Sequence, residues 1–180
     1  MILGLDISTS ITGFCIVDAG GEIIRSGAWD LRNKNKFTSE FEKASFIQEE
    51  IYQIKAQYPI ERVYVEKPFM FFKSGGSTAK TMATLQRFNG IISWIVNETF
   101  KKEPTYLTSA QARKLLGIKT SRGQKAKKEV IKWLLDNVPT FDVEYTKFGN
   151  PKPKYFDIAD AIVIAKAALV ELDERKNSNT

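Results

Sequence analysis

Three short apolar segments lie within the first 29 residues, and the turns between them are too short to contain a helix. These segments cover residues 1–5, 13–17 and 22–29. Parallel neighbours would need a crossover of about a dozen residues, so strands joined this closely pair antiparallel. The chain is therefore predicted to begin with a three-stranded antiparallel meander.

The rest of the chain alternates between helical and extended patterns. Apolar spacing and breaker residues predict helices over residues 37–58, 79–100, 109–117, 123–138 and 155–173, with Thr108 or Ser109 as the cap of the third. Short apolar runs predict further strands over residues 62–65 and 105–107. This order predicts one α/β domain over residues 1–173 and a flexible tail over residues 174–180. Its five-stranded mixed sheet has three antiparallel strands, then parallel strands, and helices on both faces.

The sequence contains no histidine, which limits the chemistry available to it. Ser-His-Asp and Cys-His catalysis and histidine zinc sites are excluded, so a reaction must use carboxylates, lysines, hydroxyls or a bound metal. The single cysteine, Cys15, lies in an apolar run and is expected to be a small core residue.

Two further features indicate where the protein works. No apolar stretch approaches the length of about 18 residues that spans a membrane, and the N-terminus lacks the basic start of a secretory signal. A cytoplasmic protein with no membrane partner is expected. Lysine and arginine number 27 against 21 acids, a net charge of +6 that favours polyanionic partners only weakly.

Four acids occupy positions that suit a metal site. Asp6 and Glu66 each follow a predicted strand, and Asp157 and Asp160 share one face of the last helix in an apolar stretch. Each acid alone has a structural alternative, as a turn cap, a solvated strand end or a partner of the helix dipole. Together they predict a site for two Mg²⁺ ions about 3.5–4 Å apart that hydrolyses phosphodiesters.

Several motifs resemble those of the RuvC-like Holliday junction resolvases, in the ribonuclease-H-like superfamily. Residues 2–13 are similar to the opening strand of that family, residues 65–70 to its second acidic motif, and residues 156–161 to its C-terminal acidic pair. Residues 107–132 resemble its basic region, so the resemblance covers nearly the whole chain in order. Residues 139–154 are longer and more basic than in cellular bacterial members, which points to a looser relative such as a phage-encoded enzyme.

The resemblance implies a ribonuclease-H-like fold and a homodimer that makes paired cuts in four-way junctions and other branched DNA. Its metal ligands would be Asp6, Glu66, Asp157 and Asp160, with Mg²⁺ as the cofactor and Mn²⁺ able to replace it. Lys114, and either Lys125 or Lys128, lie where the family places phosphate-binding or catalytic lysines. It assigns no accessory branch-migration partner to this chain.

Basic and aromatic residues predict the DNA-binding surface. Six cations fall within 14 residues and suit phosphate contacts, although a solvated charged face is the alternative: Lys119, Arg122, Lys125, Lys127, Lys128 and Lys132. Phe69 and Lys73 lie in an aromatic loop after Glu66, and Phe69 is expected to wedge into the junction centre. Phe71 and Phe72 either stack on bases or pack beneath the loop. The helix that carries Trp94 is expected to form the dimer interface.

Other functions fit parts of the pattern. A related nuclease would act on flaps, replication forks or RNA–DNA hybrids, and a non-catalytic module would only bind DNA. The segment around Asp6 also resembles the phosphate-binding hairpin of sugar kinases and actin-like ATPases. Those proteins normally need a second domain and a glycine-rich phosphate loop, neither of which 180 residues supply.

Overall fold

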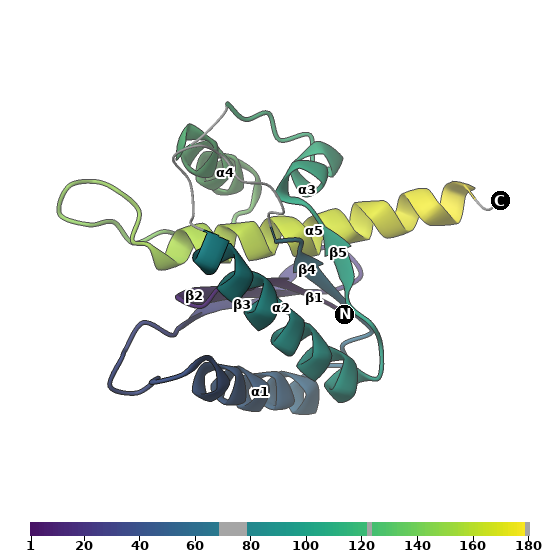
Figure 1. Ribbon diagram of the computed structural model, residues 1–180. Coiled ribbons are helices and arrows are strands. Elements are labelled where there is room, and N and C mark those ends of the chain that lie inside the picture. Colours follow the sequence, from purple (N-terminus) through teal and green to yellow (C-terminus); the bar gives the residue numbers. More distant parts are fainter. Residues whose placement is uncertain (69–78, 122–123, 179–180) are drawn as a thin grey trace.

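The computed structural model describes residues 1–68, 79–121 and 124–178, without the side chains of residues 124 and 125 (Figure 1). Its five strands form one sheet in the order β3-β2-β1-β4-β5. Their bounds are β1 Ile2–Asp6, β2 Ile11–Val17, β3 Ile23–Asp30, β4 Arg62–Glu66 and β5 Thr105–Leu107. The first three strands pair antiparallel, and β4 and β5 continue the sheet parallel to β1, which confirms the predicted fold class.

The turn before β2 is tighter than predicted. The hydroxyl of Ser8 donates to the carbonyl of Ile11 at 2.8 Å, and the hydroxyl of Thr12 donates to the carbonyl of Ser8 at 2.9 Å. These bonds close the turn over a few residues, in the manner of the hydroxyl-containing turns that serine and threonine favour. As a result β2 begins at Ile11 and not at residue 13.

Two helices cover one face of the sheet and three cover the other (Figure 1). The first pair is α1 Glu40–Gln57 and α2 Ala79–Phe100, and the other three are α3 Ser109–Leu115, α4 Gln124–Asn137 and α5 Lys154–Ser178. β2 shows why the core has two layers, because Phe14 and Ile16 join the apolar cluster under α1 and α2, while Cys15 and Val17 join the cluster under α5. The prediction of Cys15 as a core residue is confirmed.

Local hydrogen bonds and ion pairs explain where two helices differ from their predicted bounds. A capping box between Ser39 and Glu42 starts α1 at Glu40, later than residue 37. At the other end of the chain α5 continues to Ser178, so residues 174–178 of the predicted tail are helical. Arg175 pairs with Glu171 one turn earlier at 3.0 Å, in the favourable order of acid before base.

Across the described ranges, no helix is long and apolar enough to cross a membrane.

Two glycines allow α5 to lie directly on the sheet. A β-carbon at Gly13 would lie 2.0 Å from the carbonyl oxygen of Asp157, and one at Gly4 would lie 2.7 Å from the carbonyl oxygen of Ala161. Both distances are shorter than atoms tolerate, and both neighbours are backbone atoms. The missing side chains in β1 and β2 therefore set the depth at which α5, with its acids, meets the sheet.

The variant Gly13→Ala tests this close approach. We expect its free energy of unfolding to fall by about 1–3 kcal/mol or more, because the added methyl group overpacks a rigid backbone contact. Denaturant unfolding measures the change. Gly90→Ala is the matched control, since a β-carbon there meets nothing within 4 Å, and a helical glycine replaced by alanine should stabilise α2 by about 0.5–1 kcal/mol. Wild-type stability in Gly13→Ala would contradict the close contact.

Candidate metal centre

Three of the four predicted acids meet at one edge of the sheet. Asp6 ends β1, Glu66 ends the parallel neighbour β4, and the strand register pairs the residues just before them, Leu5 with Val65. Asp160 approaches from α5, which packs across both strands. One carboxylate oxygen from each of Asp6, Glu66 and Asp160 lies within 4.8 Å of the other two. Carboxyl ends of strands collect sites in this way, and oxygen donors suit a hard divalent cation.

Asp157 lies beside this group of three and is not a member of it. It occupies the first turn of α5, three residues before Asp160, and its charge contributes to the raised pKa of Asp6. Its own pKa is raised to about 6, mainly by burial, with Lys127 acting against the shift. Asp157 is therefore close enough to interact electrostatically with the cluster.

Burial raises the pKa of every carboxyl in the cluster, and repulsion from neighbouring acids adds to the shift at Asp6 and Glu66. Burial is the largest cause at Asp6, whose pKa lies well above its ordinary value, followed by the charges of Glu66 and Asp160. Burial and the charge of Asp160 raise the pKa of Glu66 to about 7, and burial raises that of Asp160. A bound cation would relieve this repulsion, so the donor set fits a divalent metal.

Ser109 and Arg113 support the cluster from α3, and the sequence assigned neither of them to the site. The Ser109 hydroxyl donates a hydrogen bond to Oε1 of Glu66, and Nε of Arg113 donates to the Ser109 carbonyl at 2.9 Å. The Arg113 charge lowers the pKa of both Glu66 and Asp160 against the effect of burial. One signal was available, since β5 continues the parallel sheet and its end should lie beside that of β4.

Among the lysines whose side chains the structure describes, Lys127 is the one that forms an ion pair with the acids. Its Nζ lies 3.5 Å from Oδ2 of Asp160. Burial would lower the pKa of Lys127, but the carboxylates of Asp160, Asp6, Asp157 and Glu66 together raise it. The sequence assigned Lys127 only to phosphate binding, whereas its position on α4 makes it part of the carboxylate site.

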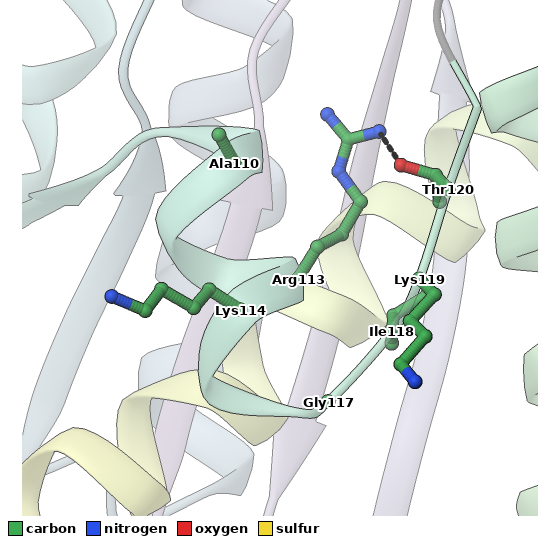
Figure 2. A pocket seen from close by; sticks show the side chains of 7 residues that line it. All are labelled: Ala110, Arg113, Lys114, Gly117, Ile118, Lys119 and Thr120. Carbon is green, nitrogen blue, oxygen red and sulfur yellow. Dashed lines mark hydrogen bonds between the residues drawn. The ribbon is translucent and has the colours of Figure 1, made fainter.

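A pocket of about 410 Å³ lies between α3 and the segment that leads to α4. Figure 2 shows the side chains that line it. Arg113 extends across it and donates from Nη1 to the Thr120 hydroxyl at 3.4 Å. Lys119 also lines this pocket. Lys114 points the opposite way from Arg113 and lines a second pocket with Glu171 (Figure 2). Of the two neighbouring cations, Arg113 and not Lys114 faces the acids.

The other basic and aromatic residues predicted to contact DNA either do not lie at the acids or fall outside the described residues. Lys128 donates to the side chain of Asn150 at 3.1 Å, and Lys132 is exposed on α4. Phe69, Lys73 and Arg122, with Phe71 and Phe72, lie outside the described residues, and so does the side chain of Lys125.

Comparison with known proteins gives a structural likeness without a detectable sequence relative. No family model matches the chain, and no curated protein matches it by sequence. RuvC of Thermus thermophilus, solved with a Holliday junction substrate, superposes with a TM-score of 0.70 at 14% identity over 96% of this chain and 94% of its own. A second Thermus thermophilus RuvC structure gives 0.65 at 16% identity, over 97% and 96% of the two chains. The chain has the RuvC fold.

The yeast mitochondrial Holliday junction resolvase Ydc2 shares this RuvC fold. It superposes with a TM-score of 0.60 at 13% identity, over 98% of this chain and 80% of its own. The ribonuclease-H-like architecture predicted from the motifs is therefore confirmed over nearly the full length. At these identities the likeness concerns the RuvC fold alone.

The raised pKa values predict how folding stability depends on pH. A rise in pH should lower stability without a cation and increase the stabilisation that a cation provides. In EDTA, we expect stability to fall as the pH rises from about 4.5 to about 7, because folded Glu66 keeps a proton that the unfolded chain releases. Divalent cations bind carboxylates in their ionised form, so we expect Mg²⁺ to raise the melting temperature more at pH 8 than at pH 6. At a concentration 100 times its Kd it should add about 2.7 kcal/mol.

Thermal melts with a Mg²⁺ titration measure both effects. Glu66→Gln should abolish most of the Mg²⁺ shift, whereas Asp173→Asn should keep it, because Asp173 is a 71% exposed acid at the far end of α5. A Mg²⁺ shift of equal size in wild type and Glu66→Gln would contradict a cation site at the cluster.

Proposed function

We propose that this protein is a divalent-metal-dependent endonuclease that cuts branched DNA, with the four-way junction as its main substrate. The observation that carries the proposal is the cluster of Asp6, Glu66 and Asp160, whose carboxylate oxygens lie within 4.8 Å of one another at the sheet edge of a RuvC fold. Carboxylates held this close without a cation repel one another, and structural ion pairs do not need three of them.

The residues of the site fall into two groups, acids that would bind the metal and cations that would contact the phosphate. Asp6, Glu66 and Asp160 would hold Mg²⁺, and Asp157 would be the fourth ligand of a site for two ions, with Mn²⁺ as a substitute. Bound Mg²⁺ neutralises phosphate charge and makes water a stronger nucleophile near neutral pH. Ser109 orients Glu66 through its hydroxyl. Lys127 and Arg113 lie beside the acids, where their positive charges can hold a non-bridging oxygen of the scissile phosphate.

The choice of a junction substrate rests on symmetry and on one protein with the same fold. The Thermus thermophilus RuvC structure contains a Holliday junction substrate. Paired cuts in a four-way junction need two matched sites, which a two-fold homodimer supplies. Trp94, 61% exposed on α2, supports α2 as the dimer surface, because large exposed apolar side chains are enriched at interfaces. We also propose that the protein acts in the bacterial cytoplasm, on host or phage DNA.

A cleavage assay tests the reaction and its substrate. We expect the wild type to cut a four-way junction in Mg²⁺, to cut flaps, linear duplex and RNA–DNA hybrid less well, and to be inactive in EDTA. Asp6→Asn and Asp160→Asn should still bind the junction but lose at least about 100-fold in cleavage rate, since even an outer-shell change at a metal site costs about 10–100-fold.

The control for these variants is Asp173→Asn, which removes an exposed acid from the same helix and should cut like wild type. Cleavage in EDTA would rule out the metal mechanism. Faster cleavage of flaps or RNA–DNA hybrids than of junctions would make one of those the main substrate. The assignment as a metal-dependent nuclease would still hold.

Two lysines of α4 should behave differently. Lys127→Ala should lower the cleavage rate by roughly 10- to 100-fold with a small change in junction affinity, because Lys127 acts on the carboxylate site. Lys132→Ala should weaken DNA binding about equally for all sequences. It should also reduce the slope of log affinity against log salt concentration by about 1, as expected for the loss of one phosphate contact. Single-turnover cleavage and binding over a salt series separate the two. Identical behaviour of both variants would contradict the role assigned to Lys127.

A further inference from the structure

Between α4 and α5 the chain forms an ordered hairpin, residues 143–153, which we call the α4–α5 hairpin. Tyr145 and Pro151 form an antiparallel bridge, and the amide of Thr146 donates to the carbonyl of Asn150 at 2.7 Å. Gly149 has a φ of 73°, a conformation that closes the turn and favours glycine. Figure 1 shows the hairpin projecting beyond the start of α5, away from the rest of the molecule.

The base of the hairpin is fixed to its surroundings. Glu144 accepts hydrogen bonds from Lys152 and Lys154 at 2.6 Å each and from the Tyr155 hydroxyl at 2.7 Å. Lys128 of α4 donates to the side chain of Asn150 at 3.1 Å. These contacts tie the projecting segment to both flanking helices, so its tip is presented at low conformational cost.

The tip carries an aromatic ring that the described protein leaves uncovered. Phe148 is 78% exposed, more than any other large apolar side chain in the described ranges. The Nζ of Lys147 lies 5.0 Å from the centroid of its ring. A rigid, exposed aromatic residue next to a lysine suits a nucleic acid, because the ring can stack on a base while the cation meets the backbone phosphate.

The hairpin lies within reach of DNA bound at the metal centre. The second arm of the hairpin leads directly into the first turn of α5, which carries Asp157. Extended chain covers at most about 3.3–3.6 Å per residue, so the six steps from Phe148 to Lys154 span up to about 20 Å. At about 3.4 Å per nucleotide along one strand, this is roughly six nucleotides. The tip can therefore reach the bases near a branch point while the acids hold the cut site.

We propose that the α4–α5 hairpin is a second DNA-contacting element, in which Phe148 stacks on an unpaired base beside the branch point and Lys147 contacts the adjoining phosphate. The inference rests on branched DNA as the substrate. Stacking is independent of base identity, so the hairpin recognises the branch and not a sequence.

Junction binding in EDTA tests the hairpin without any cleavage. Phe148→Ala should weaken binding to a four-way junction by roughly 5- to 140-fold, the effect of losing one stacked base, and change binding to fully paired duplex much less. Phe148→Trp should bind like wild type, with its added fluorescence quenched on the junction. Phe148→Leu should bind as weakly as Phe148→Ala, because it lacks an aromatic face. Fluorescence anisotropy measures the affinities.

Phe41→Ala is the matched control, because Phe41 is 71% exposed but lies on α1, across the sheet from α5. It should bind the junction like wild type. Equal junction binding by Phe148→Ala and wild type would overturn the inference, and so would an equal loss on paired duplex. If Phe148→Ala bound the junction like wild type but had a lower mass in analytical ultracentrifugation, the hairpin would instead contact a second copy of the chain.

The same proteins separate this inference from the proposed function. Weaker binding by Phe148→Ala together with no Mg²⁺-dependent cleavage by wild type would support the hairpin contact and overturn the nuclease. Mg²⁺-dependent cleavage by wild type together with unchanged junction binding by Phe148→Ala would support the nuclease and overturn the hairpin contact.

Discussion

The close packing of α5 on β1 and β2 is the contact on which the rest of the structure depends. Gly4 and Gly13 leave no side chain between strand and helix, so the backbone of Asp157 and Ala161 lies against the sheet. This depth brings Asp160 within 4.8 Å of Asp6 and Glu66. A helix lifted by one methyl group would still cover the core, but its acids would no longer meet those at the strand ends.

The concentration of negative charge at this point is unfavourable in itself, and the surrounding residues offset part of it. Burial and repulsion raise the pKa values of the acids, while Lys127, Arg113 and the Ser109 hydroxyl stabilise their ionised forms. These partners come from α3 and α4, not from the strands. The site therefore combines a rigid acidic centre, which suits a cation, with a basic border, which suits a phosphate.

The two faces of the molecule have separate roles in this proposal. On one face, α2 carries the exposed Trp94, which fits association with a second copy. The helices α3, α4 and α5 lie on the other face, where α5 supplies Asp157 and Asp160, α3 and α4 supply the nearby cations, and the α4–α5 hairpin projects (Figure 1). A DNA strand bound on this second face could contact the phosphate-binding groups, the metal centre and the exposed aromatic ring.

The sequence alone determined the succession of strands and helices, the mixed sheet with helices on both faces and the candidate acids, because local periodicity and turn length decide which residues end a strand or share a helix face. It identified Asp6, Glu66 and Asp160 for that reason. It did not distinguish Lys127 from the other cations near the start of α4, and it did not assign Ser109 or Arg113 to the site. Those roles depend on how α3 and α4 pack beside a sheet edge distant in sequence. Only the tertiary structure decides them, since charge interactions depend on distances through space that no local pattern contains.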